Sequence, residues 1–156
     1  LLHDLGKAVT PADVLPRHIG HEKGGLRRVD ELCNRIKAPN AHRELALAAC
    51  EFHLLAHRAR ELTGKTLLKL LKATGALRPQ GHFEAFLAVC EADTRGRLGK
   101  EASPYPQADY LRRGRDIARG VTAAAFVEQG LQGKAIGEAI AREQVRRLES
   151  LRGDAG

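Results

Sequence analysis

The chain opens on Leu1-Leu2-His3-Asp4-Leu5-Gly6-Lys7, and the His-Asp pair at its centre is the most informative feature of the sequence. A neutral imidazole and a carboxylate are both ligands for a divalent cation, and side by side at the end of a helical turn they approach one ion from two directions. Gly6 is expected to break that turn, and Lys7 to meet an anionic substrate. A dipeptide alone is weak support, because His-Asp pairs are more often structural or solvated. The metal interpretation therefore depends on ligands further along the chain.

The composition favours an all-helical protein. Aromatic residues make up only 4% of the 156 residues and there is no Trp or Met, so the core must be built from Leu, Ala, Ile and Val. Leu and Ala are strong helix formers. No window reaches the roughly 18–20 apolar residues that a membrane span needs, so no membrane association is expected. Because the chain begins at Leu1 and not at Met, we expect Leu1-Leu2 to end an apolar helix that starts upstream.

Cysteine usage and net charge indicate the compartment and the class of partner. Cys33, Cys50 and Cys90 are widely spaced and form no C-x-x-C motif, which predicts free thiols buried on helices in a reducing cytoplasm. The net charge of +7 favours polyanionic partners and is compatible with nucleic acid.

Apolar residues at helical spacing, bounded by Gly and Pro, predict a helical bundle. Helices are expected at about 21–37, 41–61, 66–74, 82–92, 107–129 and 134–151. The segment 8–20 is expected to form a loop, and 94–107, with two Gly and two Pro, is the best candidate for a boundary. No convincing strand pattern occurs. We therefore predict an all-α bundle over 1–100 with a small helical C-terminal extension over 101–156.

Further metal-ligand candidates lie at or near the ends of these helices. His21 opens a helix directly after the proline-containing loop and can point back toward the His-Asp pair. His53 and His57 lie four residues apart and share one helical face, a spacing that can hold an ion but is common without one. Asp93 ends an apolar helix, an unusual place for a carboxylate that has no partner. His57 is expected to support the site or lie on the surface.

These residues resemble the motif of the HD superfamily of metal-dependent phosphohydrolases. That superfamily has an α-helical core and binds metal through a His, a His-Asp pair and a later Asp. The resemblance implies that His3, Asp4 and Asp93 are metal ligands and that His21 and His53 are auxiliary histidines. A metal-binding His upstream of the pair is missing from this chain.

Longer stretches carry a closer resemblance. The segments TPADVLPRHIGHE at 10–22, LLKLL at 67–71 and EADTRGR at 91–97 are similar to the bacterial multifunctional CCA proteins, the tRNA nucleotidyltransferases that build the 3′ CCA end. The resemblance covers essentially the whole chain and implies the C-terminal HD domain of such a protein. It implies a metal-dependent phosphatase, 2′-nucleotidase and 2′,3′-cyclic phosphodiesterase. The carboxylate motif of the nucleotidyltransferase head is absent, so nucleotide addition by this chain is not expected.

The resemblance also implies roles for individual residues. The predicted metal ligands are His3, Asp4, His21 and Asp93. Mixed imidazole and carboxylate ligands suit Mn, Co, Ni, Fe or Zn better than an all-oxygen Mg site, and the expected cofactor is a divalent ion, Ni, Mn, Co or Mg. His53 either completes the metal sphere, binds phosphate or protonates the leaving oxygen. Lys7 is the other catalytic candidate, and small phosphoesters such as 2′,3′-cyclic nucleotides are the expected substrates.

A basic stretch from residue 95 to 119 is the candidate for contact with the 3′ end and body of tRNA. Its predicted RNA-binding residues are Arg95, Arg97, Arg112, Arg113 and Arg115. Tyr105 and Tyr110 are interleaved and could stack on bases. The alternative is a solvated helix face with internal ion pairs. Two other functions stay open: a non-catalytic tRNA-binding module of the same enzyme, and an HD nucleotide phosphohydrolase unrelated to tRNA.

Overall fold

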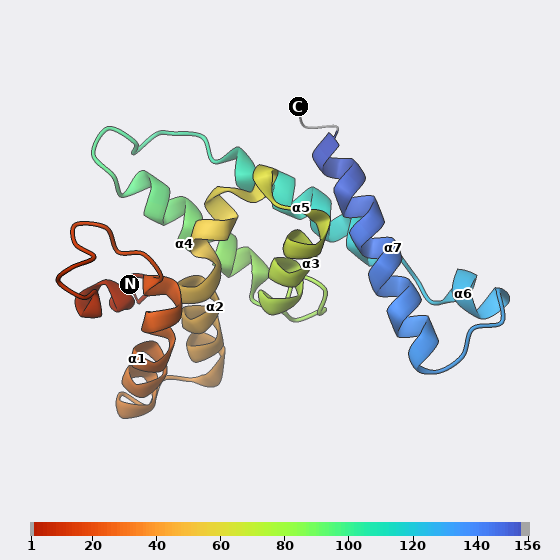
Figure 1. Ribbon diagram of the computed structural model, residues 1–156, viewed down its shortest axis with the longest axis horizontal. Helices are drawn as coiled ribbons and strands as arrows, with labels where there is room; N and C mark the ends of the chain where they lie inside the picture. The colour runs from red at the N-terminus through yellow and green to blue at the C-terminus, as the bar shows by residue number, and fades with distance from the viewer. Residues whose placement is uncertain (1, 154–156) are drawn as a thin grey trace. The chain divides into compact units, whose positions relative to one another are not determined.

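The computed structural model describes residues 2–153, and throughout this part all regular secondary structure is helical (Figure 1), which confirms the all-α prediction. The contacts divide the chain into two compact units. Unit 1 contains the residues up to His57 together with His82–Ser103, and unit 2 contains Arg58–Gly81 together with the residues from Pro104 onward. The predicted domains 1–100 and 101–156 stay a prediction. The expected helix end at Leu1-Leu2 rests on Leu1, which lies outside the described residues.

Unit 1 is built from one short 3₁₀ helix and three α-helices. These are η1 (Leu5–Val9), α1 (His21–Arg35), α2 (Asn40–His57) and α4 (Phe83–Arg95). Helix α1 packs against both η1 and α2, and α2 packs against α4 (Figure 1). Val29, Cys33 and Cys50 form a buried cluster between the first two helices. The unit therefore places the start of the chain, the start of α1, the middle of α2 and the end of α4 within reach of one another.

Gly6 allows η1 to lie directly on the backbone of α1. A Cβ at this position would lie 1.9 Å from the carbonyl oxygen of His21 and 2.7 Å from the amide nitrogen of Gly25. The expectation that Gly6 breaks a helical turn is wrong, since Gly6 lies inside the 3₁₀ helix and is buried there. Its lack of a side chain serves packing: it lets Asp4, the N-cap of η1, come close to the first turn of α1.

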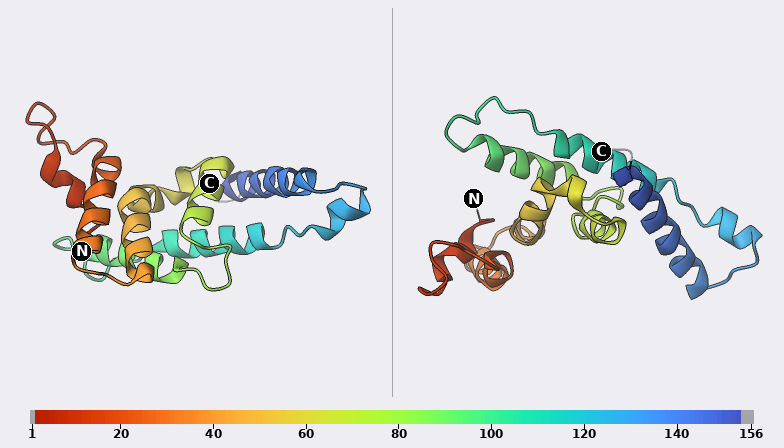
Figure 2. Two further views of the ribbon diagram at one scale, coloured as in Figure 1. Left: turned by 90° about the horizontal axis from the view of Figure 1, so that it is seen from below. Right: turned by 45° about the horizontal axis from the view of Figure 1, so that its top comes forward.

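Unit 2 packs three longer helices around a leucine core. Its elements are η2 (Ala59–Glu61), α3 (Gly64–Ala73), α5 (Pro106–Arg119), α6 (Ala124–Glu128) and α7 (Lys134–Gly153). Helix α7 packs against α3 and α5, and the chain reaches it through α6 (Figure 2). The fully buried leucines of the unit are Leu67, Leu70, Leu71, Leu111 and Leu148.

Side chains cap the ends of the unit 2 helices. Thr63 precedes α3 and its hydroxyl oxygen accepts a hydrogen bond from the amide of Thr66. The carboxylate of Glu149, on α7, accepts a hydrogen bond from the amide of Gly64. The side-chain amide of Gln144 donates to the carbonyl of Ala118 near the end of α5. These bonds satisfy backbone groups that a helix end leaves without an intrahelical partner.

Two predicted helices are shorter than expected. The helix expected to run to residue 61 ends at His57, because Arg58 leaves the helical conformation and a separate 3₁₀ turn follows. The helix expected over 107–129 is two helices, α5 and α6. Gly120 ends α5, and the β-branched pair Val121-Thr122 follows it. Glycine and β-branched residues have low helix propensity, and the prediction from apolar spacing missed the helix end that they cause.

Two other predictions from composition can be compared with the structure. No helix in the described part of the chain is long and apolar enough to cross a membrane. All three cysteines are free and buried, as predicted. Burial, together with nearby carboxylates, raises the pKa of Cys50 to about 11, so its thiol stays protonated at neutral pH.

Candidate metal centre

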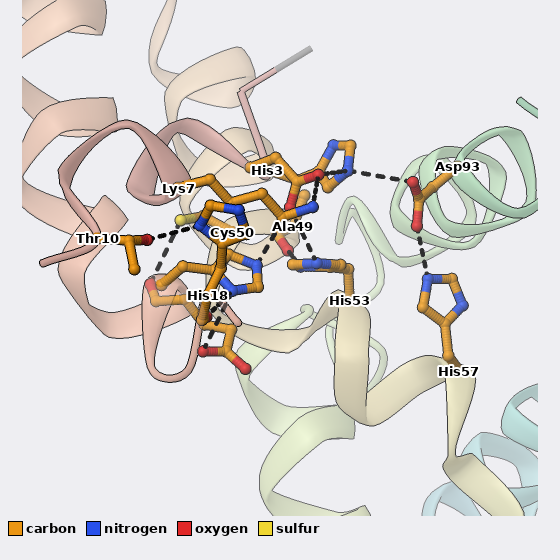
Figure 3. Close-up of polar contacts among 12 residues, drawn as sticks. His3, Lys7, Thr10, His18, Ala49, Cys50, His53, His57 and Asp93 are labelled. Carbon is orange, nitrogen blue, oxygen red and sulfur yellow. Dashed lines mark hydrogen bonds and ion pairs between the residues drawn. The ribbon is translucent and has the colours of Figure 1, made fainter. Parts of the chain in front are cut away.

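Four helical elements of unit 1 bring the predicted metal ligands together. Asp4 caps η1 and follows His3, His21 opens α1, His53 lies in α2, and Asp93 lies in the last turn of α4. Figure 3 shows the side chains of His3, His53 and Asp93 close to one another. His53 is almost fully buried, with 1% of its surface exposed. The structure therefore brings these residues together, and their roles stay a prediction.

Asp4 lies at the centre of the cluster. Its Oδ1 lies 3.1 Å from Nε2 of His21 and 3.7 Å from Nε2 of His53, while its Oδ2 lies 3.4 Å from Nε2 of His3. Oδ2 also accepts a hydrogen bond from the ammonium group of Lys7. Burial raises the pKa of Asp4, but the Lys7 hydrogen bond and the nearby positive charges lower it by more, so the net pKa lies below its ordinary value. An ionised carboxylate thus faces three imidazole rings.

Backbone carbonyls fix the tautomers of two of these rings. Nδ1 of His21 lies 2.7 Å from the carbonyl oxygen of His18, and Nδ1 of His53 lies 2.8 Å from that of Ala49. Because a carbonyl oxygen only accepts, each Nδ1 carries a proton, so Nε2 is the atom of each ring that is left to bind a metal ion. Burial is the main cause that lowers the pKa of His53, which favours the neutral form.

The buried polar atoms of the cluster fit a divalent cation. Four of them make no hydrogen bond: Nδ1 and Nε2 of His3, Oδ1 of Asp4, and Nε2 of His21. Buried polar atoms normally have partners, and lone pairs that face one another without a shared proton are unfavourable. One ligand atom from each of His3, Asp4 and His53 lies within 4.8 Å of the other two, a group that could hold a metal ion. A cation among these atoms would satisfy them together.

Asp93 joins the cluster from α4 and is held by His57. Its Oδ1 lies 3.2 Å from Nε2 of His3, and its Oδ2 accepts a hydrogen bond of 2.8 Å from Nε2 of His57 (Figure 3). Burial raises the pKa of Asp93, but the His57 hydrogen bond and the charges of His3, His57 and Arg97 lower it further, to a net value below normal. The sequence predicted His57 to be a supporting or surface residue, and the structure places it in a hydrogen bond with the carboxylate of Asp93.

His57 is predicted to set the metal affinity without touching the metal. The variant His57→Leu removes the donor to Asp93 and is expected to weaken binding of a divalent cation by roughly 10–100-fold. The variant His57→Gln keeps an amide donor at about the same reach and is expected to restore most of the affinity. Competition with a metal-chelating dye measures both values. Equal losses in the two variants would contradict a hydrogen-bonding role.

The remaining predicted site residues are placed differently. Arg97 lies 3.6 Å from Oδ2 of Asp93, whereas Arg95 pairs with Glu91 on its own helix. Arg112, Arg113 and Arg115 belong to α5 in unit 2. Arg112 donates to Asp109, and Arg115 donates to Asp116. RNA binding by these arginines stays a prediction.

The proposed stacking of bases on tyrosine is wrong. Tyr105 and Tyr110 are only 7% and 3% exposed, so their rings form part of the core and offer no face to a base. Tyrosine carries a large apolar ring as well as a polar hydroxyl, and the sequence alone does not show which property a given site uses.

Comparison with known proteins shows the family. The chain is 52% identical over 154 residues to the multifunctional CCA protein of Alkalilimnicola ehrlichii, 48% identical over 156 residues to that of Thioalkalivibrio sulfidiphilus, and 47% identical over 150 residues to that of Pseudomonas fluorescens. This chain belongs to the multifunctional CCA protein family. The alignments cover 99%, 100% and 96% of the chain and 37%, 38% and 37% of the relatives, so the chain spans a little over a third of their length.

The match to the CCA protein family confirms the resemblance carried by the segments 10–22, 67–71 and 91–97. The chain corresponds to the C-terminal part of its CCA protein relatives. No family model matches the chain, and no solved structure matches it.

Proposed function

We propose that this chain is the HD phosphohydrolase part of a tRNA CCA-adding enzyme and hydrolyses 2′,3′-cyclic and terminal phosphates with the help of a divalent cation. One observation carries the proposal. Oδ1 of Asp4 and Nε2 of both His3 and His21 are buried and make no hydrogen bond, and each of the two imidazole nitrogens lies within 3.4 Å of a carboxylate oxygen of Asp4. Such a set of atoms is typical of a metal site.

The residues of the cluster divide into metal ligands and phosphate-binding groups. His3, Asp4, His21 and Asp93 would hold the cation, and the lone pair on Nε2 of His53 favours a ligand role for this residue too. A bound divalent cation supplies positive charge that neutralises phosphoryl oxygens and lowers the pKa of water toward 7.

Cationic side chains lie around the same cluster. Lys7 reaches Asp4 and Arg97 reaches Asp93, and both side chains are exposed to solvent. From these positions their charges can bind the oxygens of a phosphate ester and orient it toward the cluster. Of the two other functions left open by the sequence, the family membership favours a link to tRNA over an unrelated nucleotide phosphohydrolase. Cytoplasmic localisation stays a prediction.

A metal-reconstitution assay tests the proposed function. The chain is stripped of metal, resupplied in turn with Ni, Mn, Co or Mg, and assayed for hydrolysis of 2′,3′-cyclic AMP and 2′-AMP. We expect activity with at least one of these ions and none in the stripped protein. A matched control is His42→Ala, because His42 is an exposed histidine of α2 that takes no part in the cluster. Silence with every ion would contradict the phosphohydrolase and favour the non-catalytic RNA-binding module.

A further inference from the structure

The imidazole ring of His21 is held toward the metal cluster by the backbone of His18. The carbonyl oxygen of His18 accepts two hydrogen bonds from His21, one of 3.2 Å from the backbone amide and one of 2.7 Å from Nδ1 of the ring. With Nδ1 engaged in this way, Nε2 of the same ring lies 3.1 Å from Oδ1 of Asp4. The direction of this predicted metal ligand therefore depends on where the carbonyl group of His18 lies.

The residue between them along the chain, Gly20, does little to fix that position. It is the N-cap of α1, and because it has no side chain it offers no capping oxygen to the first turn of the helix. Its φ of 78° lies in the left-handed region, which glycine adopts without strain. Since glycine restricts the backbone least, the direction in which the chain enters α1 has to be set by contacts of the neighbouring residues.

The ring of His18 makes such a contact with Thr10. Its Nδ1 lies 2.7 Å from Oγ1 of Thr10, and both residues are half-buried (Figure 3). A hydroxyl group both donates and accepts, so this hydrogen bond forms with either neutral tautomer of the ring. Thr10 is the C-cap of η1, and its own amide donates to the carbonyl of Lys7. The contact therefore ties the start of α1 to the end of the 3₁₀ helix that follows the His-Asp pair.

The segment that joins these two residues is mostly exposed. Among residues 11–17, Val14 is half-buried and the others are exposed to solvent. The backbone hydrogen bonds that the amides of Val14 and Arg17 donate each reach back only three residues, so they form local turns and leave the ends of the segment free to separate. The side-chain contact between Thr10 and His18 closes the segment at its ends, and it thereby restricts where the carbonyl group of His18 can lie.

We propose that Thr10 is a positioning residue of the metal centre: its hydroxyl group holds the ring of His18, and the carbonyl group of His18 in turn holds His21 toward Asp4. The proposal rests on the proposed function only in taking the cluster to be a metal site. When the arrangement that binds a ligand is only partly populated, the apparent affinity falls by that fraction. Without the hydroxyl group of Thr10, His21 adopts the binding arrangement for less of the time, and the cation binds more weakly.

Exchanging Thr10 for Val and for Ser tests the role of the hydroxyl group. Thr10→Val keeps the shape of the side chain and lacks the hydroxyl group, whereas Thr10→Ser keeps the hydroxyl group and loses a methyl group. The net contribution of one hydrogen bond corresponds to roughly a three- to tenfold change in an equilibrium constant. We expect Thr10→Val to bind Mn²⁺ and Co²⁺ more weakly by that factor, measured by competition with a metal-chelating dye, and Thr10→Ser to bind them nearly as the unaltered chain does. An equal loss in both variants would overturn the proposal.

A double-mutant cycle separates positioning through His18 from any other effect of Thr10. The variant His18→Phe removes the ring nitrogen and leaves the backbone carbonyl in place. If the two side chains act through their mutual hydrogen bond, the double variant Thr10→Val/His18→Phe loses no more metal affinity than either single variant does. Losses that simply add would overturn the proposal. The control Thr122→Val makes the same exchange at an exposed threonine of unit 2 and should leave the metal affinity unchanged.

Proteolysis in EDTA keeps this result distinct from the proposed function. Trypsin cleaves after Arg17, an exposed residue of the closed segment, and cleavage requires local opening. We expect cleavage at this site to be roughly three- to tenfold faster in Thr10→Val and in His18→Phe than in the unaltered chain. Unchanged cleavage would overturn the proposal, even for a chain that binds no ion, and so would faster cleavage without any loss of metal affinity. An unaltered chain that bound none of the ions would instead refute the proposed function.

Discussion

Replacing Asp4 by Asn is expected to abolish hydrolysis of 2′,3′-cyclic nucleotides and to weaken binding of a divalent cation roughly a hundredfold or more. A change in the residues that merely support a metal ligand already costs roughly 10–100-fold in affinity. Asp4 contributes more than such support, because its carboxylate faces His3, His21 and His53 at once. The Asn side chain has nearly the same shape but no charge, so the loss is chemical and leaves the packing of the cluster in place.

Binding and stability measurements separate this loss from unfolding. Calorimetric titration with each ion gives the affinity, and a ligand that binds only the folded protein raises its unfolding temperature. We expect this rise in the unaltered chain and none in the Asp4→Asn variant. The control Asp30→Asn changes a carboxylate of α1 that pairs with Arg43, and it should retain both metal binding and hydrolysis. An Asp4→Asn protein that keeps its metal affinity would show that the cluster is not a metal site.

The predicted metal ligands were accessible from sequence because short motifs mark them. The His-Asp pair, the helix-opening His21 and the helix-ending Asp93 each stand at a position that a pattern of Gly, Pro and apolar residues identifies. Their convergence follows from the way the helices pack, and the geometry agrees with it. The all-α fold was predictable because a core of Leu and Ala favours helices and the apolar residues recur at helical spacing.

The contact of His57 with Asp93 could not be predicted from the sequence, because the two residues lie far apart along the chain. Its partner Asp93 lies 36 positions away, and the only local signal was a spacing of four from His53. The break after α5 was missed because the apolar period continues across Gly120 into a second helix.

A single methyl group at Gly6 is expected to disrupt the junction that places the His-Asp pair. In the variant Gly6→Ala, the new Cβ would lie 1.9 Å from the carbonyl oxygen of His21 and 2.7 Å from the amide nitrogen of Gly25. Both are backbone atoms of α1 and have no rotamer with which to move aside, so η1 must shift away from the helix. Overpacking of this kind costs about 1–3 kcal/mol. We expect the unfolding temperature to fall by about 3–10 °C.

The same shift should weaken the metal centre, because His3 and Asp4 directly precede η1 while His21 opens α1. Thermal unfolding and metal titration of one protein sample measure both effects. Gly24→Ala is the matched control: a Cβ at this position of α1 meets no atom within 4 Å, and alanine favours a helix over glycine by about 0.5–1 kcal/mol. The control should therefore gain stability and keep its metal affinity. Gly6→Ala could lose stability and yet bind metal as tightly as the control does. That outcome would show that contacts with the imidazoles position the His-Asp pair, and that the close packing of η1 on α1 matters for folding alone.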